Sequence, residues 1–340
     1  MKTYFISTLL FLLGLLTFSA CEKAFFEPEP ADDPVAVFEH LWSAFKEDYG
    51  PFEERGIDWD ATYSQFRPQI SEATTEEALY GVLTQMLATL DDGHVNLSMP
   101  GRPVFRSNTW FRERTDDSLF NLNVVKQFYL APGFESGEEE SYVEGLIGNE
   151  VAYVWFDYVA DNWAALKDVL EKYHDKKGLI VDLRHNQGGD FTYAFANMGR
   201  LTNEKRLIFT SKTKNGPGPN DFTDWHSWHL EPQGVFWDKK IVVLTDRYTI
   251  SAGERAVMAF RALPQVTIVG DTTNGATSTM IGRELANGWN YSIATQKVKL
   301  FDNQSYEGIG IVPDIRVINS LSDLANGRDA VLEKALEVLE

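Results

Sequence analysis

Short apolar segments with strand character alternate with amphipathic segments over residues 151–270, and this alternation restricts the fold most. The strand-like segments are VAYVWFDYV, GLIVDLR, KIVVLTD and QVTIVGD. Apolar residues recur at intervals of three and four in NWAALKDVLEKYHD, FTYAFANMGRL and RAVMAFRAL, which is typical of helices. Strands that alternate with helices form a parallel sheet covered by helices. We therefore predict an α/β core over residues 151–340.

The rest of the chain suggests smaller parts around this core. Residues 35–100 contain the helical patterns VAVFEHLWSAFKEDY and EEALYGVLTQMLATL, and they predict an N-terminal helical subdomain. Residues 101–150 mix short apolar runs with turn residues and predict a β-rich connecting region. Near the end, WNYSIATQKVKLFD suggests a hairpin and DLANGRDAVLEKALEVLE a C-terminal helix.

The first 20 residues have the layout of a secretory signal, with Lys2 before an apolar run that ends in small residues. Cys21, the single cysteine, follows directly, and FSAC resembles a bacterial lipoprotein cleavage site in which that cysteine is lipidated. A plain signal peptide with an incidental cysteine is the alternative. Residues 21–34 are acidic and contain prolines, which suits a tether. We expect an exported chain in a bacterial cell envelope, anchored to a membrane by lipid; the side it faces is left open.

The charge of the chain argues against a nucleic-acid partner. Lys and Arg number 31 against 50 Asp and Glu, which gives a formal net charge of −19. Binding to a polyanion requires basic patches, and no long Lys/Arg block is present in the sequence.

Two turns of the predicted core have unusual chemistry. Gly188 and Gly189 follow the strand GLIVDLR, and paired glycines let backbone N–H groups approach a ligand closely. A tight turn is the alternative explanation. Ser251 leads from a strand into a helix, where N–H donors and the helix dipole favour an anion. Ser251 and Glu254 also have the spacing of a capping box, in which the serine is only a helix cap.

A nucleophilic serine needs a base that takes a proton near neutral pH. His94 follows Asp91, Asp92 and Gly93 at the end of a helical pattern and is one option, although a lone histidine is more often structural. His226 and His229 in DWHSWHL raise the possibility of a metal. Because no further His or Cys cluster lies nearby in the sequence, we interpret them as part of an aromatic surface loop, and we expect no zinc and no cofactor.

Five motifs occur together from about residue 38 to the C-terminus: LDDGHVNL, GLIVDLRHNQGG, VVLTDRYTISAGE, VGDTTNGATS and YEGIGIVPDIRV. Their order resembles the C-terminal-processing and tricorn-type serine peptidase family. The resemblance implies a ClpP/crotonase-like core with an N-terminal helical subdomain. It also implies that the protein hydrolyses peptide bonds of peptides or proteins through an acyl-enzyme.

Carried over by motif, Ser251 is the nucleophile. The N–H of Ala252 and a glycine N–H from Gly188 and Gly189 form the oxyanion hole. The C-terminal-processing branch has a lysine where this chain has Ala276, so a Ser–Lys dyad is excluded on the motif.

The tricorn-type branch uses a histidine from the helical subdomain, which corresponds to His94, and a glutamate that corresponds to Glu307. The chain departs from this pattern in two ways. Gly93 replaces the serine that links the histidine to the glutamate, so Glu307 reaches His94 differently or another residue, such as Asp92, orients it. No PDZ module lies between the helical region and the core.

Two other functions fit the same motifs. A non-catalytic lipoprotein could bind peptides or other ligands on this scaffold, because a fold does not fix a function. An esterase could use the same nucleophile. The sequence does not indicate an oligomeric state or a substrate sequence.

Overall fold

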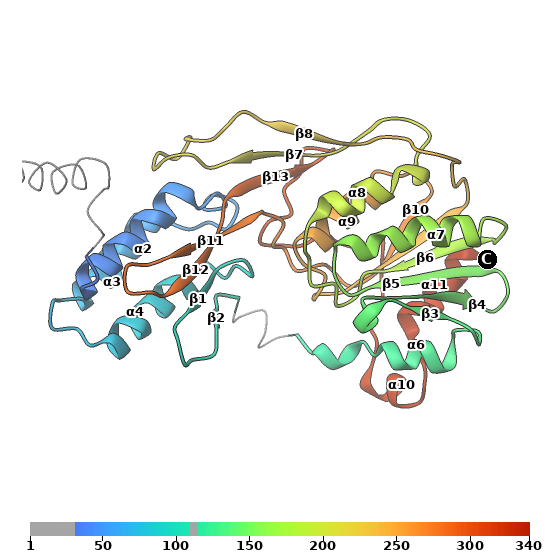
Figure 1. Ribbon diagram of the computed structural model, residues 1–340, viewed down its shortest axis with the longest axis horizontal. Coiled ribbons are helices and arrows are strands. Elements are labelled where there is room, and N and C mark those ends of the chain that lie inside the picture. The colour runs from blue at the N-terminus through green and yellow to red at the C-terminus, as the bar shows by residue number, and fades with distance from the viewer. Residues whose placement is uncertain (1–30, 109–114) are drawn as a thin grey trace, which may run out of the picture.

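The computed structural model describes residues 31–108 and 115–340 and places two structural units side by side (Figure 1). The predicted signal segment 1–20, Cys21 and most of the predicted tether lie outside the described residues. Pro34, the last residue of that tether, already begins the first described helix. Among the described residues, no helix is long and apolar enough to cross a membrane.

The larger unit contains a seven-stranded sheet in the order β14-β10-β9-β6-β5-β4-β3. Its strands are β3 (Glu135–Ser136), β4 (Tyr142–Ile147), β5 (Val151–Phe156), β6 (Gly178–Asp182), β9 (Lys240–Thr245), β10 (Val266–Gly270) and β14 (Ile315–Arg316). The strands from β14 to β5 run parallel, whereas β4 and β3 are antiparallel at one edge. The predicted α/β fold with a parallel sheet is therefore confirmed.

Helices cover both faces of this sheet. The helices on one face are α7 (Ala164–Lys172), α8 (Phe191–Asn197) and α9 (Ala252–Arg261), and those on the other are α6 (Leu122–Phe128) and α11 (Ala330–Leu339). Side chains of β5 alternate between the two faces: Val154 packs with the first group of helices, and Tyr153 with the second. All residues of β5 are consequently buried.

The smaller unit packs three helices on an antiparallel sheet of order β11-β12-β1-β2. Its elements are α2 (Pro34–Asp48), α3 (Trp59–Phe66), α4 (Glu76–Ala88), β1 (Asn96–Ser98), β2 (Phe105–Arg106), β11 (Met280–Glu284) and β12 (Asn290–Ala294). The predicted helical subdomain therefore contains a four-stranded sheet as well as helices. Residues 280–294, which we assigned to the core, pack here because Tyr291 and Ile293 of β12 fill the apolar interior under the helices.

A third sheet, β13-β7-β8, spans both units (Figure 1). It consists of β7 (Arg206–Thr213), β8 (His226–Leu230) and β13 (Gln296–Leu300). The hairpin predicted over 289–302 is wrong: β12 pairs with β11 and β1, whereas β13 pairs with β7. The reason is that the side chains of the two strands belong to different cores. His226 and His229 lie in β8 rather than in a loop.

Two further predictions need correction. The region 101–150 is not only a connection, since it contains α6 and supplies β3 and β4 to the main sheet. The C-terminal helix is interrupted at Gly327, which has a φ of 77°, so that α10 (Leu321–Ala325) precedes α11. Short 3-10 helices are η1 (Arg67–Gln69), η2 (Asp117–Leu119), η3 (Glu138–Glu140), η4 (Asp161–Trp163) and η5 (Gly199–Leu201).

Candidate active site

The turn before α9 holds Ser251 in an unusual backbone conformation. The carboxylate of Asp246 accepts the N–H groups of Tyr248 and Thr249, both at 3.0 Å, which fixes the chain where β9 ends. Ser251 then adopts φ 58° and ψ −120°, a conformation that a residue with a side chain seldom takes. Backbone strain of this kind is concentrated at functional sites, where the surrounding structure maintains it.

Ser251 and Glu254 are arranged as a capping box at the start of helix α9. Glu254 Oε2 accepts the Ser251 N–H at 3.2 Å, so the glutamate part of the predicted capping box is formed. The Ser251 side chain faces the N–H of Glu254 as the other half of the box, without a hydrogen bond of normal length and angle. The predicted capping box is therefore present, and the positive φ of Ser251 is what distinguishes this turn from an ordinary helix start.

The glycine pair lies directly against this serine. A Cβ atom at Gly188 would lie 2.7 Å from Ser251 Cβ, and one at Gly189 would lie 2.1 Å from the carbonyl oxygen of Val159. Both glycines have positive φ, 81° and 136°. The Ile250 N–H also donates to the Asn186 carbonyl at 3.1 Å and so joins the two turns. Only residues without a side chain allow this approach.

The predicted oxyanion donors differ in availability. The Gly188 N–H donates to Asn186 Oδ1 at 3.1 Å and is occupied within the turn. The N–H groups of Gly189 and Ala252 have no acceptor among residues 31–108 and 115–340. These two groups, rather than that of Gly188, can therefore bind a developing oxyanion.

His94 lies in the segment between α4 and β1 of the smaller unit, and it is 3% exposed. The backbone N–H of His94 donates to Asp92 Oδ1 at 2.8 Å, and its backbone carbonyl accepts the Ser292 hydroxyl at 2.7 Å. Neither ring nitrogen has a hydrogen-bond partner within the described part of the chain, and Nδ1 is 3.9 Å from Asp92 Oδ1. Burial lowers the pKa of His94 below 6.5, so the ring is neutral at pH 7 and can accept a proton.

Glu307 is not hydrogen-bonded to His94. Its Oε2 accepts the N–H and hydroxyl of Thr277, both at 2.8 Å, and the N–H of Ser278 at 3.1 Å. Its Oε1 accepts Arg55 Nη2 at 2.5 Å and Nε at 3.2 Å. The structure thus places the predicted glutamate in the site, but both of its oxygens have other partners.

Arg55 is the residue of this site that sequence reasoning missed. Its side chain is 7% exposed, and Nε is 3.4 Å from Asp92 Oδ2 as well as bonded to Glu307. Its other donors reach the carbonyl oxygens of Asp91 at 2.5 Å and Gly275 at 2.8 Å. Arg55 therefore connects the two carboxylates on the side of His94 and holds the smaller unit against the core.

Asp92 is the carboxylate that approaches the His94 ring, with Oδ1 3.9 Å from Nδ1. It is fully buried, and its Oδ2 accepts the Tyr49 hydroxyl at 2.8 Å. A Cβ atom at Gly93 would lie 2.8 Å from Ile250 Cδ1, the end of a flexible side chain, so a serine at this position would require Ile250 to shift. Ile250, from the turn that holds Ser251, thus packs beside the position that corresponds to the linking serine.

The remaining surroundings suit a substrate of some size. A cleft of about 910 Å³ at the junction of the two units is lined by Gly93, Gln187, Ile250 and Asn274.

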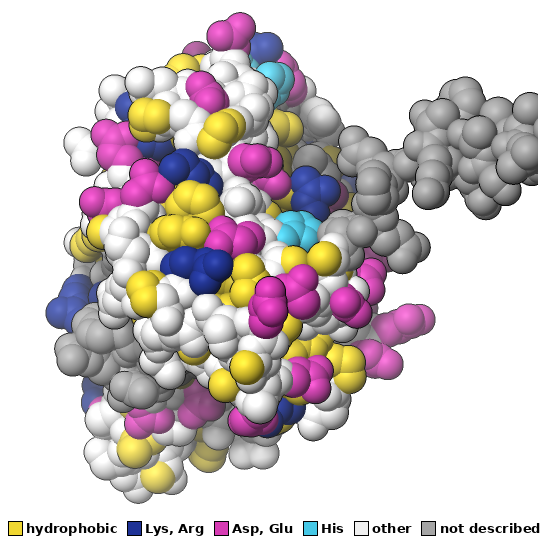
Figure 2. Space-filling view, turned by 90° about the vertical axis from the view of Figure 1, so that its left-hand side faces the viewer, with side chains coloured by type: hydrophobic (Ala, Val, Ile, Leu, Met, Phe, Trp, Pro, Cys, Tyr) yellow, Lys and Arg dark blue, Asp and Glu magenta, His cyan; other side chains and the backbone are white. Residues whose placement is uncertain are grey.

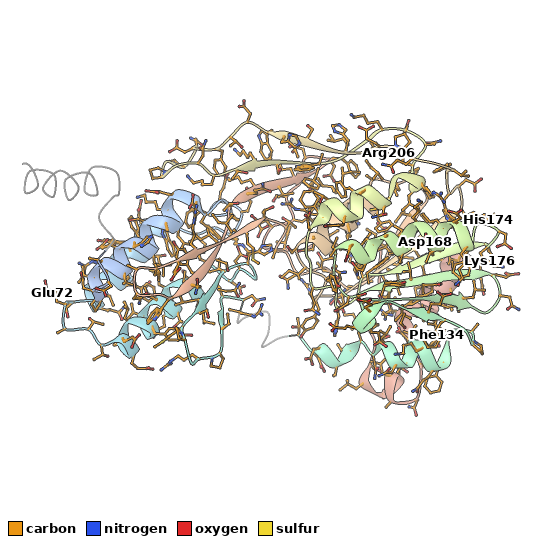
Figure 3. The ribbon with its side chains drawn as sticks, viewed as in Figure 1. Glu72, Phe134, Asp168, His174, Lys176 and Arg206 are labelled. Carbon is orange, nitrogen blue, oxygen red and sulfur yellow. The ribbon has the colours of Figure 1, made fainter. Side chains whose placement is uncertain are left out.

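Some titratable side chains lie away from this cleft. His174 lies far from the junction, at the outer end of the larger unit (Figure 3). On the face of the smaller unit, acidic side chains are spread among other types rather than gathered in one patch (Figure 2).

Comparison with known proteins assigns a family to this arrangement. Residues 150–317 match peptidase family S41, and residues 30–88 match the tricorn protease C1 domain. Among solved structures, the chain is similar to that of a candidate peptidase from Parabacteroides merdae. The two are 29% identical with a TM-score of 0.81, over 91% of this chain and 97% of the other.

Curated relatives match over shorter stretches. The chain is 29% identical over 181 residues to a carboxy-terminal-processing protease of Bartonella bacilliformis, which covers 51% of this chain and 39% of the relative. It is 27% identical over 207 residues to tricorn protease homolog 1 of Streptomyces coelicolor, with 58% and 18% covered. For the first two curated relatives, the matched share of their length is 16% and 48%. Because the S41 match covers the turns that hold Ser251 and Glu307, and the tricorn match covers the helices that precede His94, the chain belongs to peptidase family S41, as its motifs predict.

Proposed function

We propose that this chain is a serine peptidase that hydrolyses peptide bonds of peptides or proteins through an acyl-enzyme on Ser251. The observation that carries the proposal is the geometry of the serine turn. Ser251 is held at positive φ and lies against the backbone of Gly188. A helix cap alone requires neither feature, whereas a nucleophile beside backbone donors uses both.

In the proposed reaction, the Ser251 hydroxyl attacks the carbonyl carbon of the scissile peptide bond and its proton passes to His94. The N–H groups of Gly189 and Ala252 stabilise the negative oxygen of the tetrahedral intermediate. The C–N bond then breaks as His94 returns the proton to the leaving amine, and a water molecule hydrolyses the serine ester by the same route in reverse. The neutral His94 ring supports the role of base.

Arg55 and the two buried carboxylates hold His94 for this reaction. When His94 takes a proton, the negative charge of Asp92 stabilises the imidazolium, because Asp92 Oδ1 is 3.9 Å from Nδ1. Glu307 contributes charge from a greater distance and is bound to Arg55. No hydrogen bond joins His94 to Ser251 in the described structure. Their chain neighbours Gly93 and Ile250 do approach each other, and catalytic hydrogen bonds are often long when no substrate is bound.

A fluorophosphonate probe tests the proposal, because it reacts only with an activated serine. We expect labelling of the chain at Ser251, located by mass spectrometry, and no labelling in the Ser251→Ala or His94→Ala variants. Peptide and ester substrates compared side by side would then separate a peptidase from an esterase. Absence of labelling in the well-folded wild-type protein would overturn the proposal in favour of a ligand-binding protein on the same scaffold.

We also propose that the chain is exported and anchored to an envelope membrane through a lipid on Cys21. The support is the apolar N-terminal run, the small residues before Cys21 and the acidic segment that follows. Expression of the full chain in a bacterium with a radiolabelled fatty acid should label the wild-type protein in the membrane fraction but not the Cys21→Ser variant. Equal labelling of both would contradict the anchor.

A further inference from the structure

Glu254 is a fully buried carboxylate whose partners extend well beyond the helix that it begins. Its Oε2 accepts the N–H groups of Ser251 at 3.2 Å and Ala276 at 2.9 Å. Its Oε1 accepts the Gly275 N–H at 2.7 Å and the Thr273 hydroxyl at 2.6 Å. Of these four contacts, only the one to Ser251 lies within the capping box.

The chemistry of the partners requires the ionised form of Glu254. Three of them are backbone N–H groups, which can only donate. The Thr273 hydroxyl accepts the Ile311 N–H at 2.7 Å, so its own hydrogen is directed to the carboxylate. An ionised carboxylate accepts on both oxygens, whereas a protonated acid or an amide would place a hydrogen against another donor. A buried donor without an acceptor is costly.

The turn that Glu254 holds also supports the side of the site that contains His94. The carbonyl oxygen of Gly275 accepts hydrogen bonds from Arg55 Nη2 at 2.8 Å and from the Gly308 N–H at 2.7 Å. The next residues, Thr277 and Ser278, donate their N–H groups to Glu307. One carboxylate therefore connects the nucleophile to the group of charges around the base.

We infer that Glu254 is a positioning residue for the reaction proposed above, and the inference rests on that proposed function. Its ionised carboxylate fixes the Ser251 turn to the turn of residues 273–276, so that serine, oxyanion donors and base keep their relative places. Loss of the charge is expected to slow the attack of Ser251 even where the fold survives. A helix cap, in contrast, would affect stability alone.

The pH dependence of serine reactivity distinguishes the two roles. Burial raises the pKa of Glu254 to about 7; the negative charge of Glu307 also raises it, while the bonds from Thr273 and Gly275 oppose the rise. Arg255, on the same helix, is the cation that interacts with Glu254 electrostatically. As the pH falls through about 7, Glu254 becomes protonated and serine reactivity should decline. His94 becomes protonated only below 6.5.

The test is the second-order rate of fluorophosphonate labelling at Ser251, measured from pH 5 to 9 for wild type, Glu254→Gln and Glu144→Gln. We expect a wild-type midpoint near pH 7. In Glu254→Gln the plateau should fall on the order of 10²-fold, which is typical of a misplaced reacting group. Its midpoint should move below 6.5, where His94 controls the rate.

Glu144 provides the matched control, because it is a buried carboxylate in β4 that accepts the Tyr173 hydroxyl and Lys172 Nζ, both at 2.7 Å, outside the site. Glu144→Gln should lose stability and keep the wild-type rate and midpoint. Wild-type rate and midpoint in Glu254→Gln would reduce Glu254 to a helix cap and overturn the inference.

Two further results need their own interpretation: a Glu254→Gln variant that does not fold, and a wild-type protein that is not labelled. If Glu254→Gln does not fold, Glu254→Asp retains the charge on a shorter side chain: slower labelling with a midpoint still near pH 7 supports the inference, and wild-type labelling overturns it. Absence of wild-type labelling at every pH overturns the proposed function and this inference with it. Labelling that is normal in every variant overturns this inference alone.

Discussion

Replacement of Ser251 by alanine is expected to lower the turnover of a peptide substrate by roughly 10⁴–10⁶-fold, the range found for triad residues that act as a unit. The substitution removes the attacking oxygen but leaves the N–H groups of Gly189 and Ala252, which can still stabilise the oxyanion when water attacks. The substitution also removes the serine half of the capping box, which should lower the free energy of unfolding by about 0.5–2 kcal/mol. Steady-state kinetics and thermal unfolding of the same samples measure both effects.

His94→Ala should lose nearly as much turnover, and the double variant should be scarcely worse than either single one. The physical reason is that serine and base carry out one proton transfer, so removal of either partner abolishes the same step. Losses that multiply in the double variant would contradict a shared proton-transfer unit.

The two carboxylates near His94 provide companion variants for this experiment. Asp92→Asn should lower kcat on the order of 10²-fold by misplacing the ring, because Asp92 lies 3.9 Å from Nδ1 and also accepts the His94 N–H. Glu307→Gln should cost less, since the oxygens of Glu307 are bound to Arg55, Thr277 and Ser278. A larger loss in Glu307→Gln would show that Glu307 orients the base during the reaction.

The parts of the fold that depend on local patterns could be predicted from the sequence. Strand β5, helix α9 and the turn at Ser251 follow from runs of apolar residues and from residues within one or two turns of each other. The glycine pair could be predicted for the same reason, because a close backbone approach needs small residues at consecutive positions.

The parts of the fold and of the site that depend on contacts between distant residues could not be predicted from the sequence. Arg55 and Glu307 are separated by 252 positions, and nothing near Arg55 distinguishes it from other arginines. Strand β12 belongs to the smaller unit because it pairs with β1, which lies almost 200 residues earlier in the chain. Local alternation carries no information about so distant a partner, and it suggests a hairpin with β13 instead. The same limit applies to position 93, where the side chain of Ile250, 157 residues later in the chain, packs beside the position that motif comparison assigns to a serine.

Gly188→Ala is expected to lower both labelling and turnover by about 10²–10³-fold, the cost of losing one oxyanion interaction. The new methyl group would lie 2.7 Å from Ser251 Cβ and 3.1 Å from the Ile250 carbonyl oxygen, so the nucleophile turn must move away from the glycine turn. Gly188 also has a φ of 81°, which adds a backbone penalty of roughly 1–2 kcal/mol for a residue with a side chain. The affinity for a non-reacting peptide should fall less than kcat, because the cleft remains.

Gly282→Ala is the matched control for this change, because a Cβ atom at Gly282 in β11 meets no atom within 4 Å. That variant should keep wild-type turnover and a nearly unchanged melting temperature. The comparison separates the close approach of two backbones from any general effect of a Gly→Ala change. Full turnover in Gly188→Ala would mean that Ser251 tolerates displacement from the glycine turn, and the oxyanion site would then have to be sought among donors other than Gly189.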